Sequence, residues 1–252
     1  MIKIIDLSVS LTPRDQSARP PEIDYVGHEQ SAERSAPIYG IKAEDFRENK
    51  YAAIEHITLT THDTTHLDAP YHFHPTSEGK PAKTIDQIPL HWCFGDGVVL
   101  DFHRKKKGEA ITAREVETAL DRIQYNLKPL DIVLIRTDQY RHHGEAGFEN
   151  KHPGMSRKAT LYLIEQGIKV MGIDAWGWDR AHDVMINDLK AGKKEQFWES
   201  HYLGKDREYC HLERLANLDK IPIPHGFKVA AFPIKIEEAS AGWVRAVAIV
   251  DS

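Results

Sequence analysis

Short apolar runs separated by polar turns recur along this chain and alternate with segments of helical periodicity. Apolar runs of this length, bounded by turn residues, are typical of buried strands. The runs expected to form strands are Ile2–Val9, Ile54–His62, Gly97–Phe102, Asp131–Arg136, Ile168–Ile173, Phe227–Phe232 and Val244–Val250. Because strands and helices alternate, the pattern predicts an α/β fold with a mixed sheet.

Two helices can be placed from their first residues. Thr112 is followed three positions later by Glu115, the arrangement of a capping box, which predicts a helix running to about Gln124. Ser156 is expected to cap a second helix that ends at Gly167. Both helices lie between predicted strands, as the α/β pattern requires.

Residues 12–50 form a long polar stretch without clear periodicity. Ordered segments of this kind usually carry a function or contact a partner. We therefore hypothesise that the stretch is an arm across a subunit interface or a lid. The chain has no internal repeat, low-complexity linker or shift in composition, so we expect a single domain over residues 1–252.

Composition excludes several classes of protein. Hydrophobic residues make up 41% of the chain and charged residues 28%, with a formal net charge of −5. The values are typical of a globular protein, and the negative charge argues against sequence-independent binding of nucleic acid. No apolar run approaches the ~18 residues of a membrane span, and the first residues lack the pattern of a signal peptide. Two cysteines provide neither a disulfide scaffold nor a thiolate metal site. We expect a cytoplasmic protein without a nucleic-acid or membrane partner.

The stretch Thr61–His74 holds four histidines and two aspartates. His62, His66, Asp68 and His72 follow one another at intervals of four, two and four residues. Imidazole nitrogens and carboxylate oxygens are ligands of divalent cations, so the spacing favours a metal site over a group of surface histidines.

This stretch is not the helical H-E-x-x-H motif of zinc proteases. Asp63 follows His62 where that motif places its glutamate, several neighbours are β-branched threonines, and Pro70 would end a helix begun nearby. We expect the end of a strand running into a turn, which can gather ligands at irregular intervals.

The segment from His62 to His72 resembles the H-x-G-T-H-x-D-x-P-x-H motif of the metal-dependent cyclase-like hydrolases, the family of the bacterial kynurenine formamidase and isatin hydrolase type. Three further segments are similar to that family in the expected order. They are G-I-D-A-W-G-W-D from Gly172, H-Y-L-G-K-D-R-E-Y-C-H-L-E from His201 to Glu213, and P-I-K-I with W-V-R-A-V-A-I-V near the end. The resemblance covers most of the chain. It implies a single domain of swivelling β/β/α architecture.

The resemblance also implies roles for individual residues. One divalent metal would be held by His62, His66 and Asp68, and Asp68 would bridge to a second metal. His201 and Glu213 would complete this second site, while His72 would stand free of metal as the proton-transfer group. Zinc suits these ligands and manganese is its main competitor, with one or two ions per chain.

An enzyme of this type hydrolyses carbon–nitrogen bonds other than peptide bonds. The expected substrate is a small molecule, either a formamide such as N-formylkynurenine, in tryptophan catabolism, or a cyclic amide such as isatin. The alternative is a non-catalytic metal-binding protein that retains the fold. The resemblance implies a homodimer or homotetramer.

The motif glycine of this family is Thr64 here. A β-branched residue resists positive φ, so either the turn does not need such angles or its geometry differs.

Several residues near the motif segments leave two interpretations open. Trp176 and Trp178 follow a predicted strand, and either stack on an aromatic substrate or belong to the core or a subunit interface. Asp174 either orients a ligand histidine or serves a turn. His211 precedes Glu213 by two positions and is left outside the predicted ligand set, although it could support a ligand.

Three other histidines are interpreted as surface residues, because no carboxylate pattern accompanies them: His142, His143 and His152.

Overall fold

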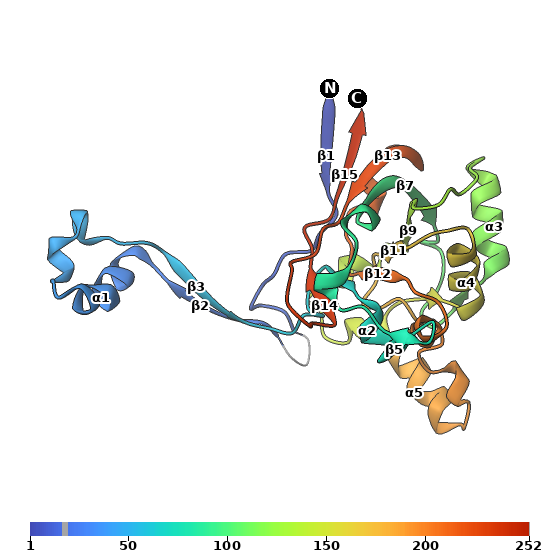
Figure 1. Ribbon diagram of the computed structural model, residues 1–252, viewed down its shortest axis with the longest axis horizontal. Coiled ribbons are helices and arrows are strands. Elements are labelled where there is room, and N and C mark those ends of the chain that lie inside the picture. Colours follow the sequence, from blue (N-terminus) through green and yellow to red (C-terminus); the bar gives the residue numbers. More distant parts are fainter. Residues whose placement is uncertain (17–19, 252) are drawn as a thin grey trace. The chain divides into compact units, whose positions relative to one another are not determined.

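The computed structural model describes residues 1–16 and 20–251, which form two compact units (Figure 1). One unit comprises Met1–Ser10 and Thr61–Ser252, and the other comprises Leu11–Thr60. The single domain expected over residues 1–252 stays a prediction, because two compact groups do not show whether the smaller one folds alone. Within the described ranges, no helix is both long enough and apolar enough to cross a membrane.

A nine-stranded mixed sheet organises the larger unit. Its strands lie in the order β1 (Ile2–Asp6), β15 (Val247–Asp251), β13 (His225–Ala230), β7 (Phe94–Asp101), β9 (Ile132–Arg136), β11 (Val170–Ile173), β12 (Cys210–Glu213), β4 (His66–Asp68) and β14 (Ala241–Trp243). Strands β7, β9, β11 and β12 are parallel, and the strands outside them pair antiparallel. The predicted α/β fold with a mixed sheet is confirmed.

Each face of this sheet packs against its own hydrophobic core. Successive side chains of a strand point to opposite faces. Ile132 and Leu134 of β9 therefore belong to one core, and Val133 and Ile135 belong to the other. All of them are fully buried, which explains why the strand has a continuous apolar sequence.

Helices α3 (Ala113–Arg122) and α4 (Arg157–Glu165) lie side by side along one face of the sheet (Figure 1). The capping box is formed as predicted: the Glu115 amide donates to Thr112 Oγ1, and the Thr112 amide donates to Glu115 Oε2 at 2.9 Å. Ser156 Oγ accepts from the Ala159 amide and caps α4.

The remaining elements of the larger unit are short. They are α2 (Pro70–Phe73), α5 (His182–Lys190), the antiparallel pair β5 (Thr76–Ser77) and β6 (Lys80–Pro81), and the parallel pair β8 (Ala110–Ile111) and β10 (Gly154–Met155). Pro70 begins α2 instead of ending a helix, because the first position of a helix needs no amide donor.

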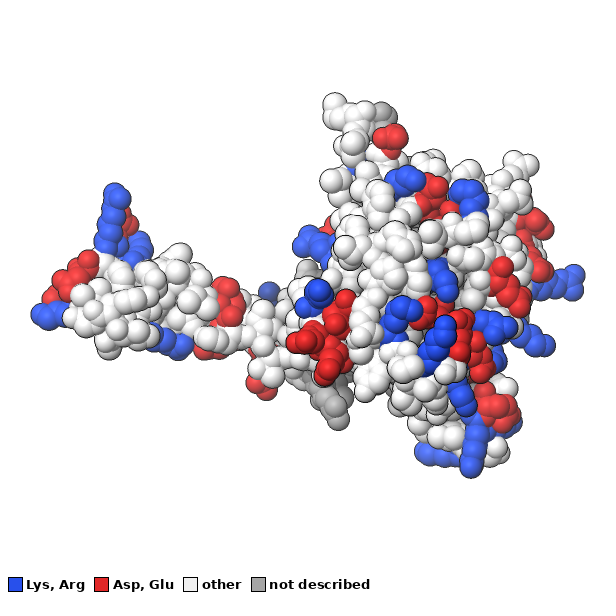
Figure 2. Space-filling view, viewed as in Figure 1, with Lys and Arg blue, Asp and Glu red and all other residues white. Residues whose placement is uncertain are grey.

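On the face that Figure 2 shows, basic and acidic side chains of the larger unit lie interspersed.

The smaller unit pairs β2 (Glu22–Val26) with β3 (Ile54–Thr58) in an antiparallel ribbon, and the helix α1 (His28–Tyr39) lies between them in sequence. The expectation of an irregular stretch over residues 12–50 is wrong for this part. Helix α1 buries only Ser31, Ala32 and Ala36. Because these residues are small or polar, the helix gives no hydrophobic periodicity.

Candidate metal centre

The register between β4 and β12 brings two pairs of functional side chains together. The two strands are antiparallel, with Asp68 opposite His211 and His66 opposite Glu213. Residues two apart on a strand point to the same face, so all four side chains are expected on one face of the sheet. All four are buried, which shields the cluster from solvent.

Three further histidines reach the cluster from neighbouring segments. His62 lies in the turn before β4, and its Nδ1 is 2.8 Å from Asp68 Oδ1. His72 lies on α2, with its ring centre 4.0 Å from that of His62. His201 begins a short 3₁₀ helix (His201–Lys205).

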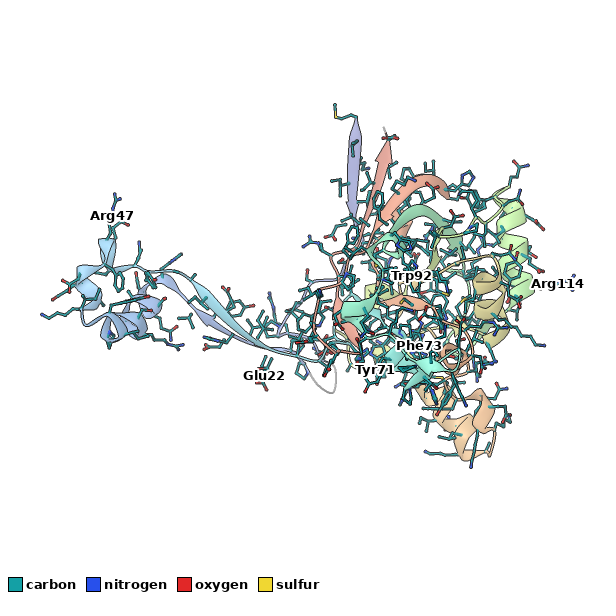
Figure 3. All side chains as sticks on the ribbon, in the orientation of Figure 1. Glu22, Arg47, Tyr71, Phe73, Trp92 and Arg114 are labelled. Carbon is teal, nitrogen blue, oxygen red and sulfur yellow. The ribbon has the colours of Figure 1, made fainter. Side chains whose placement is uncertain are left out.

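Close packing of this short helix on α2 depends on Gly204. A Cβ atom at Gly204 would collide with the ring of Phe73, which Figure 3 shows on α2. The glycine therefore allows the segment that carries His201 to lie against the segment that carries His72.

Hydrogen bonds fix the histidine tautomers so that bare nitrogens face the carboxylates. Because a carbonyl oxygen only accepts, the 2.9 Å contact between His66 Nδ1 and the Thr64 carbonyl requires the proton on Nδ1. His66 Nε2 then presents a lone pair 3.4 Å from Asp68 Oδ1.

His201 is arranged in the same way. Its Nδ1 donates to Asp179, and its Nε2 lies 3.7 Å from Glu213 Oε1. A carboxylate that holds the far nitrogen of a histidine is a common support for a metal ligand.

Several of these buried polar atoms have no hydrogen-bond partner among the described residues. They are His66 Nε2, both carboxylate oxygens of Asp68 and both ring nitrogens of His211. A buried polar atom left without a partner costs about 1–3 kcal/mol. Converging lone pairs and carboxylates also repel one another. A divalent cation removes both penalties, so the residues present fit a bound metal.

The donor atoms form two groups, in each of which they lie within 4.8 Å of one another. The first group is Asp68, His201, His211 and Glu213, and the second is His62, Asp68 and His72. Asp68 belongs to both groups, as expected of a bridging carboxylate.

Contacts inside the cluster favour ionised carboxylates and a protonated His211. Burial opposes ionisation of Asp68, but the surrounding histidines, His72 foremost, hold the pKa of this carboxyl well below its usual range. Burial also opposes ionisation of Glu213, yet the contact with His211 brings its pKa to about 2. For His211, the attraction of Asp68 and Glu213 outweighs burial and raises the pKa to about 9.

Burial lowers the pKa of His72 to about 3. Its ring is neutral in this environment, which makes it a proton acceptor before it can donate a proton.

A cavity of about 130 Å³ opens beside the cluster. Its walls include His62, His72 and His201 together with Trp176 and Trp198. The Trp198 ring stacks on His201, with ring centres 4.6 Å apart and planes 9° apart. The cavity therefore offers aromatic walls directly beside the donor groups.

The structure brings together all six residues predicted for the site: His62, His66, Asp68, His72, His201 and Glu213. Their roles as ligands or catalyst stay predictions. His72 shares a donor group with His62 and Asp68, so geometry alone does not separate it from the ligands.

The predicted ligand set omitted His211, which lies in the centre of the cluster. Its spacing from Glu213 could have indicated this position. Two residues that lie two apart on a strand point their side chains to the same face. The sequence does not show which strand pairs with β12, and only that pairing brings Asp68 opposite His211.

The two tryptophans and Asp174 take different roles. Trp178 is fully buried in the core and donates from Nε1 to Thr160 Oγ1 at 3.0 Å, whereas Trp176 lines the cavity. Asp174 accepts from the amides of Thr137 and Asp138, so the turn role holds.

Two residues near the cavity escaped the sequence interpretation. The residue that orients His201 is Asp179, at the end of the W-G-W-D motif. The interpretation of His152 as a surface residue is wrong, because its ring is buried and lines the cavity. The ring of Trp176 lies beside the His152 ring, with ring centres 6.4 Å apart.

The fold is shared with solved structures. An isatin hydrolase bound to the product analogue thioisatinate superposes with a TM-score of 0.78 over 100% of this chain and 93% of that chain, at 22% identity. A structure described as a potential metal-dependent hydrolase with cyclase activity gives a TM-score of 0.66 at 18% identity and covers 100% of both chains. The fold and the donor cluster thus define an α/β protein with a candidate metal centre.

The family model Cyclase, described as "Putative cyclase", matches residues 5–180, and the chain belongs to this family. Kynurenine formamidase of Bacillus cytotoxicus is 25% identical over 192 residues, which cover 76% of this chain and 77% of that protein. Isatin hydrolase of Roseibium aggregatum is 28% identical over 204 residues, covering 77% and 73%. The predicted family is confirmed, and so is the predicted enzyme class, a hydrolase of carbon–nitrogen bonds outside peptides, which these relatives share.

The turn between His62 and His66 does require a positive backbone angle. Thr64, at the glycine position of the motif, has a φ of 57°. The left-handed conformation costs an L-residue about 1–2 kcal/mol. The site retains this conformation because the Thr64 carbonyl accepts the proton of His66 Nδ1.

We expect Thr64→Gly to raise the free energy of unfolding by about 0.5–1 kcal/mol. Relief of the positive φ raises the free energy of unfolding by about 1–2 kcal/mol. The greater freedom of glycine in the unfolded chain lowers it by about 0.5–1 kcal/mol. Denaturant titration of both proteins measures the difference. The matched control is Thr61→Gly in the same turn, which lacks a positive φ and should lose stability. Equal losses in both variants would contradict the interpretation.

Proposed function

We propose that this protein is a metal-dependent hydrolase that cleaves the carbon–nitrogen bond of a formamide or a cyclic amide, with His72 as the proton-transfer group. The observation that carries the proposal is the convergence of bare imidazole nitrogens on Asp68 and Glu213 in a buried cluster beside a cavity. Similarity to kynurenine formamidase and isatin hydrolase supports the reaction class.

The ligands assigned to the metal are His62, His66, Asp68, His201 and Glu213. Zinc is the proposed ion and manganese the alternative, since both accept imidazole and carboxylate. When bound, such an ion supplies an activated water at neutral pH and polarises a carbonyl. Asp179 and the Thr64 carbonyl hold His201 and His66 in the tautomers that turn their Nε2 atoms toward this position.

His72 is placed to move the proton that hydrolysis requires. It lines the cavity and lies beside His62, with its ring neutral because burial lowers its pKa. A neutral imidazole accepts a proton from the attacking water and then returns it to the leaving nitrogen. Trp176 and Trp198 in the cavity walls support an aromatic substrate, such as N-formylkynurenine or isatin.

Hydrolysis of N-formylkynurenine or isatin should require bound metal. Protein purified without chelator is expected to contain zinc or manganese by elemental analysis and to hydrolyse at least one of the two compounds. Chelation should abolish hydrolysis, and the same ion should restore it. Full hydrolysis by metal-free protein would contradict the proposed chemistry, and a metal-loaded protein inactive on both compounds and on related amides would support a non-catalytic metal-binding protein.

His72→Ala should lower kcat by about 10²–10⁴-fold, the usual contribution of a general acid–base group, while the metal content stays unchanged. The control is Tyr71→Phe, because Tyr71 is the neighbouring residue of α2 and is 46% exposed. Loss of metal together with activity would show that His72 is a ligand. Unchanged kcat would remove His72 from the reaction.

We further propose that the chain forms a homodimer or homotetramer through the smaller unit. Tyr25, Ile54 and Ile57 of its β-ribbon are 59%, 45% and 47% exposed. A two-stranded ribbon is at best marginally stable in water and needs a covering surface. A second copy of the chain is the proposed cover.

Ile57→Glu should shift the protein toward monomers, because it places a charge at an exposed apolar position of the ribbon. Light scattering coupled to size-exclusion chromatography measures the change. Glu55→Gln, on the same strand and also exposed, should leave the assembly intact. A monomeric wild-type protein, or an unchanged oligomer in Ile57→Glu, would contradict the proposed assembly.

A further inference from the structure

His211 is held rigidly at the centre of the donor cluster. It lies opposite Asp68 in the strand register and is 0% exposed. Its ring stacks on Trp178 at 5.5 Å between ring centres, and it packs against Phe73 of α2, labelled in Figure 3, at 4.8 Å. Neighbouring aromatic rings therefore leave this imidazole no room to turn away from the carboxylates.

Neither ring nitrogen of His211 makes a hydrogen bond within the part of the chain that the structure describes. Nε2 lies 3.0 Å from Asp68 Oδ2 and 3.3 Å from Glu213 Oε1, but without the angles of a hydrogen bond. Nδ1 has no partner among the described residues. Buried polar side-chain atoms normally have a partner, so an ordinary core histidine does not explain this ring.

The residues around His211 already form an incomplete coordination shell. His201 Nε2 and Glu213 Oε1 are 3.7 Å apart, and Glu213 Oε1 is anchored by the Trp178 amide at 2.7 Å. One donor atom each from Asp68, His201, His211 and Glu213 lie within 4.8 Å of one another. Two imidazoles and two carboxylates are a donor set that zinc accepts, and four is its usual number of protein ligands in a closed site.

We propose that His211 is a direct metal ligand, which completes a four-donor site with Asp68, His201 and Glu213. The proposal rests on the metal dependence proposed above and adds a ligand that the resemblance to the family does not supply. A site with four protein donors leaves little room for an exchangeable water. An ion held there would exchange more slowly than one held by His62, His66 and Asp68, the ligands that the family resemblance assigns to the other metal.

The first experiment compares the metal content and affinity of wild-type protein and His211→Asn. Zinc alone is titrated into chelator-treated protein, and bound zinc is counted after equilibrium dialysis. The wild type is expected to bind two ions per chain with unequal affinity. The variant should lose the tighter ion or bind it with lower affinity. Loss of an outer-shell partner lowers metal affinity about 10–100-fold, and loss of a direct ligand should lower it by at least as much. His225→Asn, on β13 outside both donor groups, is the matched control and should bind as the wild type does.

The second experiment tests direct contact through His211→Cys. A thiolate at this position should retain the ion and, with cobalt in place of zinc, give the sulfur-to-cobalt charge-transfer band in the near ultraviolet. His225→Cys should give no such band. Because this readout is spectroscopic, it does not depend on hydrolytic activity or on which substrate the enzyme uses.

Four outcomes would overturn the proposal. One ion per chain in the wild type would mean that a protonated His211 takes the place of the second ion. A variant His211→Asn that binds one ion more than the wild type would mean the same. Unchanged affinity for two ions in that variant would exclude a ligand role, and so would a folded, cobalt-loaded His211→Cys without the band. Should neither variant fold, one ion per chain in the wild type would still overturn the proposal. No bound ion in the wild type would instead refute the proposed function itself.

Discussion

The antiparallel pairing of β4 with β12 is the constraint on which the site depends. It places Asp68 opposite His211 and His66 opposite Glu213. Two carboxylates and two imidazoles are thereby gathered in one place, and all four side chains are buried. Such a cluster is unfavourable unless a cation or a set of protons compensates it. The rest of the fold must hold these groups together against their mutual repulsion.

The two hydrophobic cores supply that rigidity. Strands β9 and β11 are buried on both faces and fix the position of β12 beside them. Outer contacts then set the orientation of each donor: Asp179 and the Thr64 carbonyl hold two histidines by their far nitrogens. These contacts orient the two histidines within the fold itself, which lowers the conformational cost of binding a ligand there.

The positive φ of Thr64 shows how local preference yields to the site. A glycine would adopt this angle without strain, yet the chain keeps a β-branched residue there. The carbonyl of Thr64 is needed to position His66, and any residue type supplies a carbonyl. The contact to His66 therefore depends on the backbone of residue 64 and not on its side chain.

The sequence by itself determined what depends on neighbouring residues. The buried strands, the Thr112–Glu115 capping box and the cluster from His62 to His72 follow from short-range spacing, and the motif identifies the family. Helix α1 was missed because it buries few apolar residues. Only the tertiary structure decided that His211, Asp179 and His152 belong to the site, because strand pairing and packing bring these residues together from segments far apart in the chain.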